Sequence, residues 1–284
     1  MTTPPANDGV FLDVPDSTYH SWDLCSSTRL KTLDAQTPRH LRHQIDNPEV
    51  WDSSAKQLGR AVHSLVLEPH KWSTRFAQAP ECDRRTKEGK QIWSDFCQMN
   101  EGREIVKADV GYQAQEMAES VLSNPIAAAL LAHTPVREMS LIAPVFGARV
   151  KSRIDAYGEL PNGDALLVDL KVTSHGGSRA SFERAIANYG YGLQAATYCR
   201  VADACKLKVS GFCFIVVETE APYCCAVYRL REDVISLFDQ KLPSLIKTYT
   251  GCVASRKWPG YPDEVQEIGI PRWFQSQLEN GEAA

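Results

Sequence analysis

The chain has 284 residues, of which 43% are hydrophobic and 23% are charged, and its formal net charge is −4 at pH 7. These values are typical of a globular protein with a substantial core, and they exclude a membrane-spanning protein because no apolar run is long enough to cross a bilayer. The acidic balance does not indicate nucleic-acid binding, although a basic patch can lie on an acidic protein. Nine cysteines without a C-x-x-C pair, and no signal-peptide pattern, predict reduced thiols in a cytoplasmic protein.

The N-terminal segment is polar and contains two consecutive prolines. We therefore expect residues 1–9 to form a flexible tail. Residues 1–25 as a whole are interpreted as a tail and lead-in to the first predicted helix, whose N-cap is Ser26 or Ser27.

Residues 54–67 carry apolar side chains at helical spacing, which predicts an amphipathic helix that ends at Pro69. His63 lies beside the apolar stripe of this helix. Such a histidine is either a hydrogen-bonded core residue or, next to an acidic centre, a metal ligand through a neutral ring nitrogen. The residues of this helix alone leave both interpretations open.

The strongest basic cluster of the chain lies in the polar segment that follows. Its members are Arg84, Arg85, Lys87 and Lys90. The cluster is either a solvated loop or a loop that contacts a nucleic-acid strand, with two aromatic residues following at helical spacing.

A strand is predicted over residues 137–143, and Glu138 lies at its start. A carboxylate in this position is either an ordinary surface group or a further acid of a functional centre. Glu138 alone leaves both interpretations open.

Residues 150–157 and 165–168 are two β-rich runs joined by a turn that contains Asn-Gly, which predicts a hairpin. The second run is apolar on both faces and is followed by Asp169 and Lys171. Since side chains two residues apart lie on the same face of a strand, these two groups point the same way, with the residue between them in the core. Asp155 is predicted to end the first strand, so its carboxylate can converge on that of Asp169.

Two acidic groups at the end of a buried hairpin repel each other and lose their hydration unless a positive charge joins them. A divalent cation meets that need, and oxygen ligands suit Mg²⁺. Lys171 would then lie beside the metal, where it can orient an attacking water or a phosphate oxygen. The alternative is a structural ion-pair cluster formed by Asp155, Asp169 and Lys171.

A helix is predicted over residues 193–202, with Gln194 and Tyr198 one turn apart on the same face. The chain shows no internal repeat and no linker long enough to separate two domains. We therefore predict one domain over residues 26–272 and a C-terminal tail over residues 273–284.

Together these motifs resemble the RecE-type exonuclease domain in the RecB-like branch of the PD-(D/E)xK nuclease superfamily. The resemblance covers residues 26–249. The segments that carry it are Leu58-Gly59-Arg60-Ala61-Val62-His63, Glu68-Pro69, Asp169-Leu170-Lys171-Val172-Thr173 and Tyr189-x-Tyr191-x-x-Gln194-Ala-Ala-x-Tyr198. The chain departs from the family pattern at Asp169, where many relatives have glutamate.

The resemblance implies an α/β fold with a restriction-endonuclease-like core, in which helices flank a central mixed β-sheet. It implies metal ligands from His63, Asp155, Asp169 and the carbonyl of Leu170, with Lys171 as the catalytic lysine. Glu138 would be a further catalytic acid. The residues implied to contact DNA or brace the site are Gln194 and Tyr198, to which the basic cluster Arg84, Arg85, Lys87 and Lys90 adds a DNA-entry surface.

The activity implied is Mg²⁺-dependent degradation of linear double-stranded DNA from 5′ ends, leaving 3′ overhangs for strand annealing. Two Mg²⁺ ions per site are expected, with Mn²⁺ as a substitute. The family also implies a homo-oligomeric ring around DNA, a tetramer or alternatively a trimer, and an annealing protein of RecT type as partner. The expected location is the cytoplasm of a bacterium or of a phage-infected host.

Three other functions remain open from the sequence. The chain could be a RecB-like endonuclease or a DNA-processing nuclease of a defence system. It could be a non-catalytic DNA-binding scaffold that kept the fold, which the intact acidic residues and lysine argue against. It could also hydrolyse small phosphorylated molecules, whereas the basic and aromatic segment favours a polymer.

Overall fold

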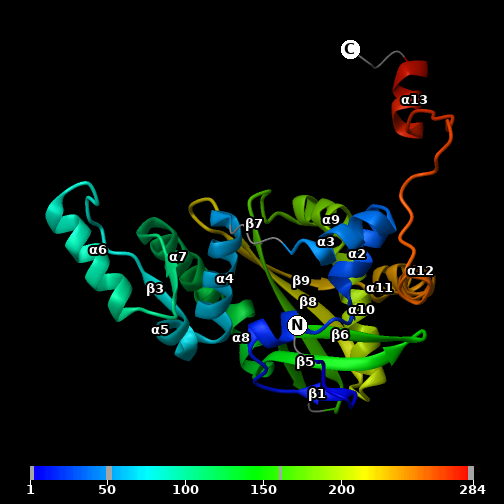
Figure 1. The fold of residues 1–284 in the computed structure, drawn as a ribbon. Helices are drawn as coiled ribbons and strands as arrows, with labels where there is room; N and C mark the ends of the chain where they lie inside the picture. The colour runs from blue at the N-terminus through cyan, green and yellow to red at the C-terminus, as the bar shows by residue number, and fades with distance from the viewer. Residues whose placement is uncertain (1–2, 49–52, 160–161, 281–284) are drawn as a thin grey trace.

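A computed structural model of the protein describes residues 3–48, 53–159 and 162–280. Figure 1 shows a central β-sheet with helices on both sides of it. Seven strands of the described residues form this sheet in the order β1-β5-β6-β7-β8-β9, with β2 paired to β6. Their bounds are β1 Gly9–Phe11, β2 Cys25–Ser26, β5 Val136–Val145, β6 Ala148–Glu159, β7 Ala165–Thr173, β8 Val209–Glu218 and β9 Cys225–Leu230.

The sheet is mixed, because β7 runs parallel to β8 and β2 parallel to β6, whereas the other neighbours are antiparallel. The predicted hairpin is formed by β6 and β7, and part of its turn lies outside the described residues. Asp155 was predicted to end its strand, which is wrong because β6 continues to Glu159. The predicted fold, an α/β core with helices flanking a mixed sheet, is confirmed.

Helices bury apolar side chains against each face of the sheet. On one face, α2, α9, α10 and α12 form a core with side chains such as Leu167 and Phe214 of the strands. On the other face, α4, α7 and α8 form a second core with Val168 and Leu170. The bounds of these helices are α2 Ser27–Ala35, α4 Ser54–Leu67, α7 Ala108–Ser123, α8 Pro125–His133, α9 Arg179–Asn188, α10 Tyr191–Ala204 and α12 Leu242–Ser255.

The remaining elements lie around this sandwich of layers. A small parallel sheet of β3 (Phe76–Gln78) and β4 (Glu104–Val106) lies beside α6 and α7 at one edge (Figure 1). The other elements are α1 Asp16–Ser21, α3 Pro38–Asp46, the 3-10 helix η1 Pro69–Lys71, α5 Trp72–Arg75, α6 Lys87–Met99, α11 Glu232–Asp239 and α13 Arg272–Glu279. None of the described helices combines the length and the apolar character that crossing a membrane requires.

Strand β7 alternates between the two cores, as its sequence requires. Leu167 lies in the core that contains α10, whereas Val168 and Leu170 lie in the core that contains α4. Asp169 and Lys171 therefore face α10, and their charged groups lie 2.5 Å apart. This agrees with the predicted period of two.

The lead-in is more ordered than the sequence predicts. A flexible tail over residues 1–9 is wrong from Pro5 onward, because Arg149 donates hydrogen bonds to the Pro5 carbonyl and to Asp8, both at 2.8 Å. Strand β1 then pairs with β5, and the rings of Tyr19 and Trp22 form a small core with Ile142. Burial of these aromatic side chains against β5 explains why the segment is held.

The predicted C-terminal tail contains a short helix, α13. Its side chains are exposed, including Trp273 and Leu278, and the helix lies away from the sheet in Figure 1. Residues 281–284 of that tail lie outside the described residues.

Candidate active site

The candidate site lies where the sheet divides between β6 and β7. These strands pair only from Ala156 with Val168 to Glu159 with Ala165, while β7 continues along β8 as far as Thr173. At the point where the ladder stops, the Leu170 N–H donates to the Asp155 carboxylate at 2.8 Å instead of to a backbone carbonyl. The division therefore opens a gap in the sheet that side chains from both faces can reach.

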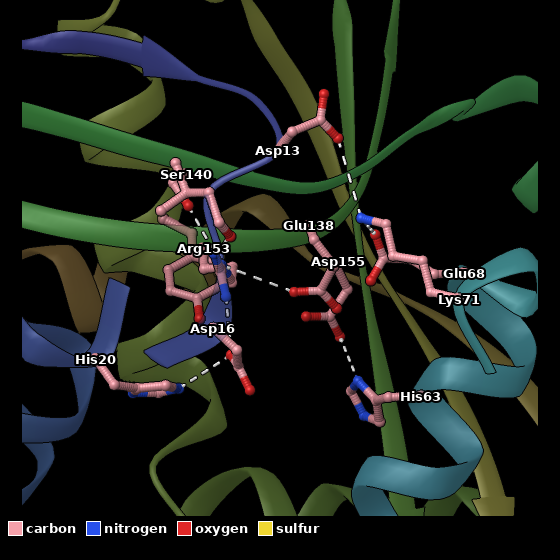
Figure 2. A network of polar contacts seen from close by, with 12 residues as sticks. Asp13, Asp16, His20, His63, Glu68, Lys71, Glu138, Ser140, Arg153 and Asp155 are labelled. Atoms are coloured by element: carbon pink, nitrogen blue, oxygen red, sulfur yellow. Dashed lines mark hydrogen bonds and ion pairs between the residues drawn. The ribbon is translucent and has the colours of Figure 1, made fainter. Parts of the chain in front are cut away.

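One group of ligand atoms converges on the β6 side of this division. His63 of α4, Glu138 of β5 and Asp155 of β6 each offer one atom, and these atoms lie within 4.8 Å of one another. Figure 2 shows His63 reaching from its helix toward Asp155, with Glu138 alongside; His63 Nδ1 lies 3.8 Å from Asp155 Oδ2. We call this set the acidic group.

The backbone at Glu138 is strained. Its φ of 48° lies in the left-handed region, which residues other than glycine seldom adopt. The flanking positions pair regularly across to β6, Arg137 with Ala156 and Met139 with Ile154. The ladder on both sides therefore holds Glu138 in a conformation that brings its carboxylate beside Asp155, and such outliers concentrate at functional sites.

Both carboxyl groups of the acidic group have raised pKa values. Burial and the neighbouring Asp155 raise the pKa of Glu138 to about 8. Burial and the neighbouring Asp169 raise the pKa of Asp155 to about 6. The nearest guanidinium, Arg153, lies 3.8 Å from Glu138 but donates at 2.8 Å to Asp16, which takes up part of its charge.

These observations fit a divalent cation. Two carboxylates with raised pKa values and one imidazole are held close together without full compensation by the protein's own cations. Carboxylate oxygens with a neutral ring nitrogen are a common ligand set for hard and borderline divalent ions. His63, Glu138 and Asp155 would hold the ion.

A second network occupies the β7 side of the division. Lys171 Nζ lies 2.5 Å from Asp169 Oδ2, and Gln194 Nε2 donates to Asp169 Oδ1 at 2.7 Å. Lys171 also lies 3.3 Å from Gln194 Oε1, and Gln194 Nε2 lies 3.2 Å from the Tyr198 hydroxyl. We call these four residues the lysine network.

The lysine network keeps Lys171 charged. Burial acts to lower the pKa of Lys171, but Asp169 and Asp155 outweigh it, so the pKa is raised. Burial raises the pKa of Tyr198 well above its ordinary value, so its hydroxyl remains protonated. A charged ammonium is thus fixed beside the acidic group, where it can stabilise negative charge.

The structure brings together most of the predicted site residues, but in two sets. Asp169, predicted as a metal ligand, lies in the lysine network and outside the compact set of ligand atoms among the described residues. Leu170, predicted to offer its carbonyl, donates its N–H to Asp155 and buries its side chain.

Two open hollows flank the acidic group. The larger has a volume of about 830 Å³ and is lined by several basic side chains, and the smaller has a volume of about 590 Å³ and includes Lys171 and Gln194. Gly59, His63 and Asp155 line both. The basic residues of the larger hollow are Arg29, Arg60, Arg75, Lys151 and Arg153.

The predicted basic cluster is not brought to this site. Arg84 and Arg85 precede α6, Lys87 and Lys90 lie in its first turn, and none of the four lines either hollow. The Arg84 guanidinium lies 3.9 Å from the centre of the Trp93 ring, and Arg85 pairs with Asp83 at 2.9 Å. Conversely, Arg153 and Asp16 at the site were not identified from the sequence, because no local motif marks a contact between residues so far apart in the chain.

Comparison with known proteins places the chain among PD-(D/E)xK nuclease-like domains. A family model described as "PDDEXK-like domain of unknown function (DUF3799)" matches residues 26–269. The structure of a "Putative exonuclease" from Eubacterium rectale is similar, with a TM-score of 0.56 and 13% identity over 94% of this chain and 99% of that chain. The structure of SSO0001 has a TM-score of 0.33 and 12% identity over 78% of this chain and 75% of that chain. A search of curated proteins finds no match.

The raised pKa values predict a pH-dependent stability in the absence of divalent cations. Because folding raises the pKa of Glu138 to about 8 and of Asp155 to about 6, the folded state holds these protons more tightly than the unfolded state. Their contribution to stability is complete below the unfolded values near pH 4 and is lost as the pH rises through about 6 and about 8. We expect the melting temperature in chelator to fall between pH 5 and pH 8.

Glu138→Gln should remove most of this decrease. One pKa unit corresponds to about 1.4 kcal/mol, and 1 kcal/mol to about 2–4 °C for a domain of this size. The fall in melting temperature between pH 5 and pH 8 should therefore be several degrees smaller in the variant than in the wild type. Glu183→Gln, which changes an exposed carboxylate on α9, is the control and should keep the wild-type slope. An equal pH dependence in wild type and Glu138→Gln would contradict the raised pKa values of this carboxylate pair.

Proposed function

The chain belongs to the family of the PDDEXK-like domain of unknown function DUF3799, and from this premise we propose that it is a metal-dependent DNA exonuclease. The observation that carries the proposal is the juxtaposition of the acidic group with the lysine network across one division of the sheet. The motifs that resemble RecE-type domains support a finer assignment. In that assignment the enzyme degrades linear double-stranded DNA from 5′ ends and leaves 3′ overhangs for annealing.

The proposed cofactor is Mg²⁺, two ions per site, with Mn²⁺ as a substitute. When bound at His63, Glu138 and Asp155, with Asp169 and the Leu170 carbonyl as further ligands, it would lower the pKa of a water and neutralise charge on the phosphate.

The chain's own residues supply the remaining chemistry. The Lys171 ammonium donates to a phosphate oxygen and stabilises the negative charge that develops during cleavage. The Gln194 amide hydrogen-bonds to both Asp169 and Lys171 and so fixes their relative positions. The Tyr198 hydroxyl accepts a hydrogen bond from the same amide and fixes Gln194 in turn. Gln194 and Tyr198 therefore act as positioning residues.

The two hollows support a polymer substrate over a small phosphorylated molecule. They lie on either side of the acidic group and share Gly59, so a strand can run through both and present one phosphodiester to the site. The larger hollow offers five basic side chains to a polyanion, although four of them, Arg29, Arg60, Arg75 and Arg153, already pair with carboxylates.

Assembly around DNA forms part of the proposal. A chain with a net charge of −4 holds DNA weakly as a monomer, whereas a closed ring retains it by topology. We propose a homo-tetramer, or alternatively a trimer, in the cytoplasm, with an annealing protein of RecT type as partner. The exposed residues Arg84, Arg85, Lys87 and Lys90 would then contact DNA at the entrance.

The activity is tested with DNA molecules that differ only in their ends. In Mg²⁺, we expect digestion of linear duplex and none of covalently closed circles, and a 5′ label should be released before a 3′ label. Lys171→Met and Asp169→Asn should each lower the rate by about a hundredfold or more. Asp203→Asn, an exposed acid on α10, is the control.

Three outcomes would contradict this assignment. Cleavage of closed circles would identify an endonuclease instead. Intact DNA with wild-type enzyme in both Mg²⁺ and Mn²⁺ would reject the nuclease. Light scattering that shows a monomer during processive digestion would reject the ring alone.

The metal site is tested by melting His63→Ala beside the wild type. We expect Mg²⁺ or Mn²⁺ to raise the wild-type melting temperature, since a ligand that binds only the folded state stabilises it. In His63→Ala this rise should shrink strongly while the melting temperature in chelator changes little. A variant that melts lower in chelator but keeps the full rise would show that His63 is a core residue.

Gly59 provides a test in which stability and activity move in opposite directions. It lies inside α4 with ordinary helical backbone, and an added Cβ would meet no atom within 4 Å. Gly59→Ala should therefore stabilise the protein by about 0.5–1 kcal/mol. Because the added methyl enters the space shared by both hollows, we expect slower DNA cleavage, and Gly59→Leu should slow it further.

The matched control is Gly251→Ala. Gly251 also lies inside a helix, α12, with no atom within 4 Å of an added Cβ, but it lines neither hollow. It should gain stability without loss of cleavage. Full activity in Gly59→Leu would contradict a strand path over this residue.

A further inference from the structure

A row of aromatic rings leads from Lys171 to the protein surface. The Lys171 ammonium lies 4.7 Å from the centre of the Tyr191 ring, and the Tyr191 ring lies 5.8 Å from that of Tyr189. Tyr189 in turn stacks on His175 at 5.7 Å with 11° between the ring planes. His175 and Tyr189 are both exposed, Tyr189 by 44%. The outer two rings therefore form a flat apolar surface open to solvent beside the proposed cleavage centre.

The turn between α9 and α10 fixes these rings. Gly190 has a φ of 64°, a left-handed conformation that glycine adopts without strain. A Cβ at Gly190 would lie 2.7 Å from Cδ of Lys31, a residue of α2, so the turn packs directly on that lysine's stem. The packing places the Lys31 ammonium 5.9 Å from the centre of the Tyr191 ring.

Lys31 has a charge that the protein compensates only in part, through Asp169 and the Tyr191 ring. Among the contacts of the described residues, its ammonium has no hydrogen-bond acceptor and no ion pair, although the residue is half-buried. Burial and the neighbouring Lys171 lower the pKa of Lys31 to about 8. A second cation held this close to Lys171 disfavours its own charge, and an anion placed there would remove the penalty.

We propose that Lys31, Tyr189 and His175 form a nucleotide subsite next to the cleavage centre, in which the stacked rings carry an unpaired base and Lys31 contacts a phosphate of the same strand. The subsite rests on the proposed nuclease function and specifies how it holds its substrate. An aromatic ring stacks on any base, so the subsite holds a strand without regard to sequence. An enzyme that works at a duplex end must hold the nucleotide that it has separated. This surface begins at His175, next to Ser174, which lines the smaller hollow together with Lys171.

The rings have no strong structural reason to be exposed together. The cores of the sheet already enclose Phe182 and Phe214, and Tyr189 and His175 lie outside them. Their removal should therefore cost little stability. This separates a binding role from a packing role by experiment.

The test is a double-mutant cycle in which one change is made in the protein and the other is an abasic site in the DNA. Binding is measured by fluorescence anisotropy in Mg²⁺, with Asp155→Asn present throughout to prevent cleavage. The probes are labelled duplexes with short unpaired 5′ or 3′ ends, in which one abasic nucleotide is moved stepwise from the end. We expect one abasic position to weaken binding by about fivefold to a hundredfold, and Tyr189→Ala to weaken binding of intact DNA by a similar factor.

Combining the lesion with the variant should weaken binding no further, because both remove the same contact. Tyr112→Ala, which removes an exposed tyrosine on α7, is the matched control and should remain additive with the lesion. The stacking surface would be overturned if Tyr189→Ala and the lesion weakened binding independently, so that their factors multiplied. It would also be overturned if Tyr189→Ala bound intact DNA as tightly as the wild type.

Lys31 is tested by the salt dependence of binding. Lys31→Met keeps the stem that packs on Gly190 and removes the charge, so the slope of log affinity against log salt should decrease by about 0.7. Lys247→Met, an exposed lysine on α12, should leave the slope unchanged. An unchanged slope in Lys31→Met would overturn the phosphate contact.

The result is distinguishable from a failure of the proposed function. If wild-type protein cleaves linear DNA but Tyr189→Ala and Lys31→Met bind as the wild type does, only the subsite is wrong. If the wild type neither binds nor cleaves DNA, the nuclease assignment and the subsite both fail.

Discussion

The close approach of carboxylates that are buried or partly buried at the division of the sheet is the constraint on which the rest of this structure depends. Glu138 and Asp155 lie side by side, and Asp169 is near enough to disfavour the charge of Asp155. Such a cluster is unfavourable unless hydrogen bonds, cations or protons compensate it. The protein supplies one hydrogen bond from the Leu170 N–H and one cation, Lys171. The raised pKa of Glu138 means that its carboxyl group also keeps its proton more readily. The remainder is what a bound cation would provide.

The sheet can hold this cluster because the strain is surrounded by regular structure. Strand β5 pairs with β6 on both sides of Glu138, so its left-handed backbone is fixed by the ladder. Two separate cores then clamp the strands from opposite faces. The energetic cost of the site is thus carried by the packing of α4, α7 and α8 on one side and α10 on the other.

The local parts of the site could be predicted from the sequence, whereas its division into two sets could not. The period of two along β7 places Asp169 with Lys171, and the period of the helix places His63 on an inward face. Nothing local indicates that β6 and β7 separate after Ala156, because a hairpin pattern is the same whether its ladder continues or stops. The partner of Arg153 and the packing of Lys31 on the α9–α10 turn are likewise contacts between distant segments, and for this reason they needed the structure.

The separation of β6 and β7 explains how one centre draws on helices from opposite faces of a sheet. His63 comes from α4, which packs on the face that buries Leu170, whereas Gln194 comes from α10, which packs on the other face. In an unbroken sheet the backbone ladder would keep these side chains apart. Here Asp155 lies 3.8 Å from His63 and accepts the N–H of Leu170, the residue between Asp169 and Lys171 on β7. Asp155 therefore contacts both the helix that carries His63 and the strand that carries Asp169 and Lys171, whereas the side-chain contacts of Gln194 lie within the lysine network.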